Sequence, residues 1–275
     1  MRECARVTFD TNTYRPVVEP ERFANHPDHA IFVGLNQAIR DGRIIPFIGE
    51  ALFTIEAIRK VARAPYLARR RPGIKTVETT TTDETAHATI SFGPDHAQHP
   101  GLSERETERL EAALQLGFRL LAQPRIGTPR PEPVRPDLHP DRFADDVDIA
   151  ARQKKFVEVA QAIESRGVGF ARAKVIGERA RVRTSRHVTW FELLDNDRYF
   201  NDDERKEIAV AVGEWVDGDN VAAHIAYNND LFCTEDKAGN NRPSIMNAEN
   251  RTWLGATYGV RLATARELHA LIVCT

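Results

Sequence analysis

The sequence predicts an α/β protein with helices on the faces of a mainly parallel sheet. Two observations lead to this class. Strand and helix patterns alternate up to about residue 62, and the same alternation returns from about residue 216. Such alternation is typical of a parallel sheet covered by helices. With 275 residues, of which 41% are apolar and 28% charged, the chain is long enough to bury a core of this kind.

In the amino-terminal part, two strands and two helices are predicted, at Ala5–Phe9, Ala30–Arg40, Arg43–Ile48 and Leu52–Val61. The first strand is a short apolar run, and Asp41-Gly42 ends the first helix. Pro46 suggests an edge position or a bulge for the second strand. The second helix rests on the spacing of Leu52, Ile55, Ile58 and Val61.

The middle of the chain has a different pattern. Thr76–Phe92 is Thr-rich and alternates apolar with polar residues around Thr82-Asp83-Glu84, which predicts a β-hairpin. Ser103 and Glu106 form a capping box for a helix that is expected to run to Leu121. The proline-rich stretch Gly127–Pro140 is expected to be a stiff loop. Further elements are predicted as helices near Asp145–Ser165 and Asp202–Val216 and a strand near His187–Phe191.

In the carboxyl-terminal part, a helix is predicted at Asp219–Tyr227 and strands at Asp230–Thr234 and Tyr258–Leu262. Thr264 with Glu267 is expected to cap a last helix. We therefore predict a single domain, formed by about residues 1–62 and 216–275, with an insertion at about 63–215.

Four acidic residues suggest a metal site. Asp10 and Asp236 each close an apolar strand pattern, while Glu56 and Asp219 lie in predicted helix starts. Groups that follow the carboxyl ends of parallel strands converge on one crevice, and gathered carboxylates suit Mg²⁺ or Mn²⁺. Glu50 is a rival for the role of Glu56, and Asp217 is an alternative to Asp219 as a helix cap.

The contexts of these acids resemble the motifs of the PIN-domain nucleases, in the same order. The motifs are Phe9-Asp10-Thr11-Asn12, Thr54-Ile55-Glu56-Ala57-Ile58, the segment from Asp219 to Ala226, and Phe232-Cys233-Thr234-Glu235-Asp236. The resemblance implies a three-layer α/β/α sandwich with a metal-dependent ribonuclease site. The insertion would add a β-hairpin and extra helices.

What the resemblance implies for the site can be stated residue by residue. Asp10, Glu56, Asp219 and Asp236 would be catalytic ligands of Mg²⁺ or Mn²⁺. Asn12 and Thr234 would be supporting polar groups. Apart from the resemblance, His224 on the predicted Asp219 helix is a third candidate, and a packed or solvated histidine is an equally open interpretation. The substrate would be RNA. Proteins of this kind are often toxins, so an antitoxin protein is a candidate partner, and a homodimer is left open.

Two basic segments are candidates for holding nucleic acid. One follows Glu56 and comprises Arg59, Lys60, Arg63, Arg69, Arg70 and Arg71. The other runs from Arg166 to Arg186. Phosphate backbones need positive charge near the catalytic metal ions, although any single arginine can equally be a solvated surface residue.

Two other functions compete with the ribonuclease. A haloacid-dehalogenase-like phosphatase also starts with an Asp after the first strand, but it requires a second Asp where this chain has Asn12. The second alternative is a non-catalytic module that binds RNA or a partner. The net charge of −2 gives no overall attraction to nucleic acid. The three cysteines lack metal-ligand spacing and no apolar run is long enough for a membrane span, so we expect a cytoplasmic protein with no membrane contact.

Overall fold

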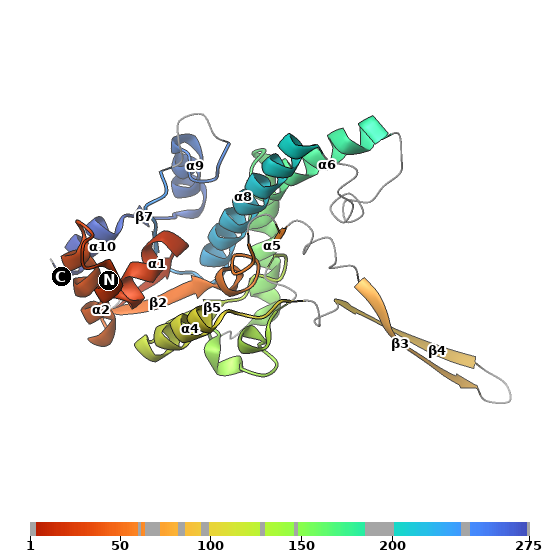
Figure 1. The fold of residues 1–275 in the computed structure, drawn as a ribbon, viewed down its shortest axis with the longest axis horizontal. Helices are drawn as coiled ribbons and strands as arrows, with labels where there is room; N and C mark the ends of the chain where they lie inside the picture. The colour runs from red at the N-terminus through yellow and green to blue at the C-terminus, as the bar shows by residue number, and fades with distance from the viewer. Residues whose placement is uncertain are drawn as a thin grey trace.

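The centre of the molecule is a five-stranded sheet (Figure 1). The computed structural model describes residues 4–59, 62–63, 72–81, 86–94, 99–126, 130–145, 148–184, 201–237 and 243–273. The sheet has the order β5-β2-β1-β6-β7, and every pair of neighbours in it is parallel. Its strands are β1 (Ala5–Phe9), β2 (Ile44–Gly49), β5 (Arg119–Leu121), β6 (Leu231–Cys233) and β7 (Leu262–Ala263).

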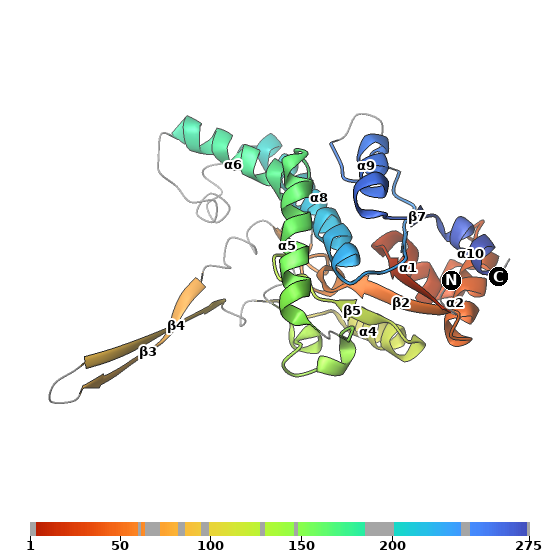
Figure 2. The same ribbon diagram turned by 180° about the vertical axis from the view of Figure 1, so that it is seen from behind.

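Helices cover both faces of this sheet. One face packs against α1 (Thr11–Val18), α2 (His29–Arg40), α4 (Glu104–Leu116) and α10 (Ala265–Val273). The other packs against α5 (Ile149–Ser165), α8 (Asp202–Ala226) and α9 (Ala248–Tyr258). Figure 2 shows α5 alongside α8 from behind, and α6 (Phe170–Thr184) joins α8 in a third apolar cluster. The predicted three-layer α/β/α sandwich is confirmed.

Successive side chains along the strands point alternately into the two cores. Val7 and Phe9 of β1 point into the core under α1 and α2. In β6, Leu231 and Cys233 enter that core, whereas Phe232 enters the core under α8. This period of two, with both faces buried, explains why the strands were detectable as short apolar runs.

The edge position predicted for the strand that contains Pro46 is wrong, because this strand, β2, is internal to the sheet. β2 runs between β1 and β5. Its pairing with β5 begins only at Phe47, opposite Arg119. Pro46 therefore lies where β2 has β1 as its single neighbour, and its missing N–H removes no bond to β5.

The helix predicted to reach Leu121 ends earlier. Ser103 and Glu106 form the expected capping box, and α4 starts at Glu104. It stops at Leu116 because Gly117 takes the left-handed conformation, with φ 110°. The chain then enters β5, which sequence periodicity did not reveal. Since β5 belongs to the central sheet, the range 63–215 is not wholly an insertion outside that sheet.

The hairpin prediction is confirmed by β3 (Pro72–Thr81) and β4 (Ala86–Pro94), which pair antiparallel. Its predicted turn and the strand predicted near His187–Phe191 lie outside the described residues. The last helix also begins as predicted: the N–H of Thr264 donates to Glu267 Oε2, and the N–H of Glu267 donates to Thr264 Oγ1. Helices α1, α6 and α9 were not predicted.

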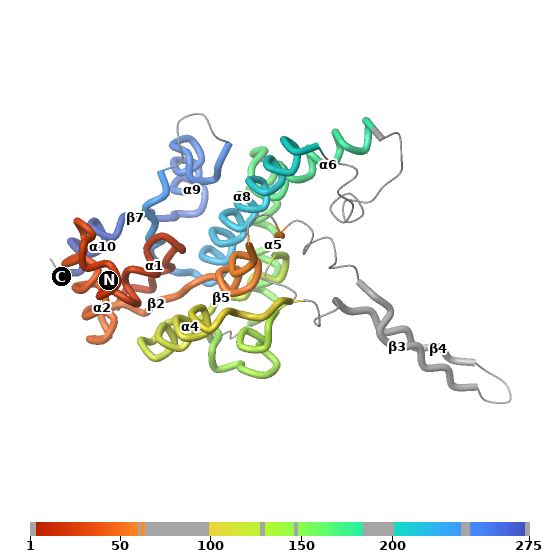
Figure 3. The backbone as a smooth tube through the Cα atoms, in the orientation of Figure 1, coloured from red at the N-terminus to blue at the C-terminus, as the bar shows by residue number. Residues whose placement is uncertain are grey.

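Two predicted helices are one. The chain is helical without interruption over the 25 residues of α8, so Asp219 does not open a helix but lies inside it. Gly218 costs the helix about 1 kcal/mol relative to alanine. A Cβ there would lie 3.4 Å from the Cα of Gly169 and from the Cγ2 of Ile163, an ordinary van der Waals contact, so α8 packs closely on the α5–α6 connection at this point. Figure 3 traces this continuous segment beside α5.

Within the described residues 50–59, β2 is not followed by an α-helix. The predicted helix over Leu52–Val61 is a 3-10 turn, η2 (Glu50–Phe53), followed by irregular turns to Ile58. Leu52, Ile55 and Ile58 are buried, so their spacing reported burial correctly but not conformation. Glu56 consequently lies in a loop and not in the first turn of a helix.

Candidate active site

Asp10 is fixed at the carboxyl end of β1 by its own backbone and by α1. Its N–H donates to the carbonyl oxygen of Cys233 on β6, at 2.9 Å. Its Oδ1 accepts from the N–H of Thr11, at 2.7 Å, and so caps the start of α1. Because β1 and β6 are parallel neighbours, the residues that follow both strands lie side by side at this edge of the sheet.

Asn12 and Thr234 orient the Asp10 carboxylate from both sides. Asp10 Oδ2 accepts from Thr234 Oγ1 at 2.7 Å and from Asn12 Nδ2 at 2.9 Å. The Asn12 amide oxygen in turn accepts the N–H of Glu235 at 3.0 Å, and the N–H of Asp236 donates to Thr234 Oγ1 at 3.0 Å. The two segments after β1 and β6 are thus joined by one polar network.

The loop that carries Glu56 is hydrogen-bonded to the same polar network and is also held through its backbone. Thr11 Oγ1 donates to Glu56 Oε2 at 2.7 Å. On the backbone side, Arg63 Nη2 donates to the carbonyl oxygen of Glu56 at 3.0 Å, and His99 Nε2 lies 3.1 Å from the carbonyl oxygen of Thr54. Arg63 and His99 flank the β3–β4 hairpin in sequence, so the segments on both sides of the hairpin hold this loop.

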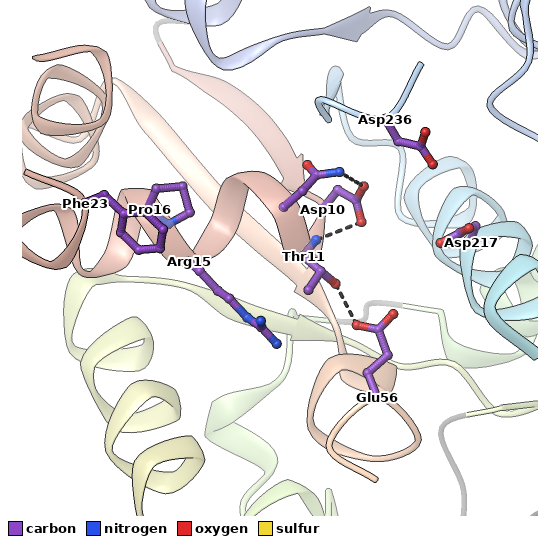
Figure 4. A pocket seen from close by; sticks show the side chains of 9 residues that line it. Asp10, Thr11, Arg15, Pro16, Phe23, Glu56, Asp217 and Asp236 are labelled. Atoms are coloured by element: carbon purple, nitrogen blue, oxygen red, sulfur yellow. Dashed lines mark hydrogen bonds between the residues drawn. The ribbon is translucent and has the colours of Figure 1, made fainter. Parts of the chain in front are cut away.

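Part of this polar network lines one open cavity of about 420 Å³. Its carboxylates come from four separate chain segments, and Figure 4 shows them facing a common space: Asp10, Glu56, Asp217 and Asp236. The other lining residues are Thr11, Asn12, Arg15, Pro16 and Phe23.

Mutual repulsion and burial shift the pKa values of two of these acids. Burial raises the pKa of Asp10 to about 6, with the charges of Glu56 and Asp236 adding to the rise and hydrogen bonds from Thr234 and Thr11 opposing it. The pKa of Asp217 is raised well above its ordinary value, first by burial and then by the neighbouring Asp10 and Glu56 carboxylates. The cavity therefore concentrates the negative charge of four carboxylates.

The structure does not bring Asp219 into this cavity. Asp219 is 2% exposed and faces the opposite side of α8, where its Oδ1 lies 3.6 Å from Arg125 Nε. Asp217 occupies the place expected for Asp219, because residues two apart on a helix are rotated by about 200°. The sequence indicates Asp217 only as a helix cap. Helical phase identifies Asp217 as the residue that faces the cavity, but only once α8 is known to be continuous.

His224 also lies away from the cavity. It is 1% exposed, its Nδ1 lies 2.9 Å from Thr8 Oγ1, and its ring packs edge-on against Phe232. Burial lowers its pKa to about 3, so it is neutral in the core. The expectation that His224 faces the site is wrong, and it has a packing role.

The choice between the two glutamates is also clear from their contacts. Glu50 is fully buried and pairs with Arg130, whose Nη2 donates to Glu50 Oε1 at 2.8 Å. Glu56 lines the cavity. Glu50 therefore anchors η2 to the loop after β5, and Glu56 is the acid that faces the site.

Among the described residues, the predicted basic segments contribute none to the cavity wall. Arg59 is exposed, Arg63 binds the Glu56 loop, and Lys60, Arg69, Arg70 and Arg71 lie outside the described residues. On α6, Arg179, Arg181 and Arg183 pair with Glu207, Glu178 and Glu204 at 2.5–2.9 Å, which favours the solvated-surface interpretation for that helix. The cation that does line the cavity, Arg15, was not predicted. It lies four residues after Thr11 on α1, a spacing that places both on one helix face.

The donor set fits a hard divalent cation. Carboxylate oxygens are the ligands that Mg²⁺ and Mn²⁺ prefer, and a cation would offset the repulsion that raises the pKa values of Asp10 and Asp217. In the described parts of the chain, no three His, Cys, Asp or Glu side chains are close enough together to coordinate one ion as they stand.

Comparison of the chain with protein-family models, with curated proteins and with solved structures finds no match. Within the described residues, no helix is both long enough and apolar enough to cross a membrane.

Proposed function

We propose that this chain is a Mg²⁺- or Mn²⁺-dependent endoribonuclease that hydrolyses RNA phosphodiester bonds at the Asp10–Glu56–Asp217–Asp236 cavity. The observation that carries the proposal is the convergence of four carboxylates from four chain segments on one open cavity. The raised pKa of Asp10 and of Asp217 supports it, because such perturbation is typical of sites that bind a cation or transfer a proton. The resemblance to PIN-domain nucleases at three of these acids points to the same reaction.

The residues of the chain would divide the work. Asp10, Glu56, Asp217 and Asp236 would hold the metal ions, which, when bound, supply activation of a water molecule and neutralisation of charge on the phosphate. Asn12 and Thr234 keep the Asp10 carboxylate oriented through bonds of 2.9 and 2.7 Å. Thr11 positions Glu56 through its 2.7 Å bond. Any of the four carboxylates that is unprotonated and not bound to an ion could accept a proton from the attacking water.

The phosphatase alternative receives no support from Asn12. In that class this position carries a second acid, whereas the Asn12 amide donates to Asp10 and accepts from the Glu235 N–H. Through these two bonds the Asn12 amide joins the segment after β1 to the segment after β6. A non-catalytic module that binds RNA or a partner is separated from the nuclease by the experiment below.

The decisive test is cleavage of a labelled single-stranded RNA by the wild-type protein in Mn²⁺ or Mg²⁺. Asp10→Asn should reduce the rate by about 10²–10³-fold, since one preorganised electrostatic contact is worth this much in other enzymes. Asp203→Asn, at an almost fully exposed position of α8, is the matched control and should retain full activity. Folded wild-type protein that leaves RNA uncut in both metals would reject the proposal and favour the non-catalytic module.

The role as a toxin, an antitoxin partner and a homodimer are further proposals that rest on the family resemblance. Induced expression of the wild type should arrest growth of a bacterial host, whereas Asp10→Asn should not. The same cultures would show whether total RNA is degraded. Light scattering on the purified chain tests the homodimer.

A further inference from the structure

The wall of the cavity is chemically divided. The four carboxylates lie at one end, while Arg15, Pro16 and Phe23 form the other (Figure 4). A cation and an aromatic ring have no part in holding a metal ion. They are, however, the two groups with which proteins bind a phosphate and a nucleobase of single-stranded nucleic acid.

Arg15 is available to a ligand. It is exposed, and no hydrogen bond or ion pair of its guanidinium is found among the residues that the structure describes, although Glu56 lines the same cavity. A guanidinium binds phosphate through two parallel N–H bonds, which gives orientation as well as attraction. On α1, Arg15 lies four residues beyond Thr11, or about 6 Å along the helix axis.

Phe23 is held in place independently of any ligand. It ends η1 (Pro20–Phe23), and its ring packs edge-on against Phe32 of α2, with ring centroids 6.4 Å apart. It is only partly buried, and its ring lies beside the buried Pro16 on the cavity wall (Figure 4). An aromatic ring fixed from behind loses little freedom when a base stacks on it.

We propose that Arg15, Pro16 and Phe23 form a nucleotide subsite next to the metal site. Arg15 binds the phosphate that adjoins the scissile one, and Phe23 stacks on the base of the same nucleotide. This inference rests on the proposed function and specifies its substrate as a strand with an unpaired base beside the cleaved bond. Stacking is tolerant of base identity, so the subsite selects single strands and not a particular sequence.

Two substrates separate the subsite from the metal site. Bis(4-nitrophenyl) phosphate has one phosphodiester and no neighbouring phosphate, whereas a short labelled oligoribonucleotide has both. Arg15→Ala should lower the ratio of kcat/KM for the oligonucleotide to that for the small ester by about 10–100-fold, as expected for the loss of a charged hydrogen bond. Arg22→Ala removes a nearby exposed arginine that pairs with Glu19, and should leave the ratio unchanged.

Phe23→Leu tests the base contact in the same way. It should weaken binding of the oligonucleotide in Ca²⁺, measured by fluorescence anisotropy, by about 5–100-fold. An oligonucleotide with an abasic position beside the scissile bond should lose this sensitivity. Arg15→Ala should also reduce the slope of log affinity against log salt by about one unit.

The outcomes distinguish the two proposals. If Arg15→Ala lowers kcat/KM equally for both substrates, Arg15 contacts the scissile phosphate or only maintains the fold. The proposal that Arg15 binds the neighbouring phosphate is then wrong. If Phe23→Leu binds intact and abasic strands with unchanged affinity, the stacking contact is wrong. If Asp10→Asn retains activity on both substrates, the metal-dependent function fails, whatever the Arg15 result.

Discussion

The cavity has two acidic sides that were built in different ways. Asp10, at the end of β1, receives three hydrogen bonds, from Thr11, Asn12 and Thr234. Asp217, in the middle of α8, has no hydrogen-bond donor among the described residues. The pKa of Asp10 is raised to about 6 in spite of its donors, and that of Asp217 is raised well above its ordinary value. The β1 side is preorganised by hydrogen bonds from residues that follow β1 and β6, whereas the α8 side depends on helical phase.

The comparison predicts a sharp difference between two acids of α8. Asp217→Asn should reduce metal-dependent cleavage by about 10²–10³-fold, because it removes one carboxylate from the cavity. Asp219→Asn should mainly lower stability, because it disturbs a buried contact with Arg125, while the folded fraction remains active. Rates per folded molecule, with the folded fraction measured by circular dichroism, check both. Greater loss of rate in Asp219→Asn would restore the assignment made from sequence.

Metal affinity should fall as the pH is lowered through about 6. The carboxylates must be deprotonated to bind a cation, and the raised pKa of Asp10 and of Asp217 makes protons strong competitors there. Below this range each pH unit should cost about tenfold for each proton that must leave. Titration calorimetry with Mn²⁺ at several pH values measures the slope. Asp10→Asn should make the slope shallower, and an affinity independent of pH would contradict the shared site.

The Glu56 loop offers a milder test of preorganisation. His99→Ala removes the contact with the Thr54 carbonyl, and Arg63→Ala removes that with the Glu56 carbonyl. Either should lower kcat by about tenfold, at the lower end of the effect of orienting groups, with little change in KM. His99→Gln, whose amide can still donate to the carbonyl, should recover much of the rate. Equal losses in His99→Ala and His99→Gln would argue against positioning by this bond.

The smallest expected effect is on stability without metal. An Asp whose pKa is raised by folding holds its proton more tightly when folded, so stability declines as pH rises from the ordinary value near 3.8 through the raised pKa. Asp217→Asn cannot undergo this loss. At a pH above this range it should therefore raise Tm by about 2–4 °C, equivalent to about 1 kcal/mol for a chain of this size, and the gain should vanish at low pH. A variant less stable at all pH values would show that the Asp217 carboxylate is stabilising.

Local patterns predicted much of the fold. The limits of β1 and the capping boxes at Ser103 and Thr264 follow from neighbouring residues, and all three are present in the structure. Predictions failed where one pattern fits two conformations. Leu52, Ile55 and Ile58 are buried in a turn and not in a helix, and the apolar stripe beyond Leu116 continues as a strand after Gly117. In both cases the apolar pattern predicted correctly which residues are buried, but it did not predict their backbone conformation.

The sequence by itself determined the β1 side of the site. In a parallel sheet the residues after neighbouring strands must meet, so the positions of Asp10, Asn12 and Thr234 at the ends of two apolar runs were enough to place them together. Only the tertiary structure decided that Asp217, and not Asp219, faces the cavity. That choice requires α8 to continue through Gly218, and the continuation is stabilised by close packing on Gly169 and Ile163, which are about 50 residues away in the chain. The cavity wall formed by Arg15 and Phe23 also depends on tertiary structure. The contacts between α1, η1 and α2 that place these residues cannot be recognised from the spacing of either residue in the sequence.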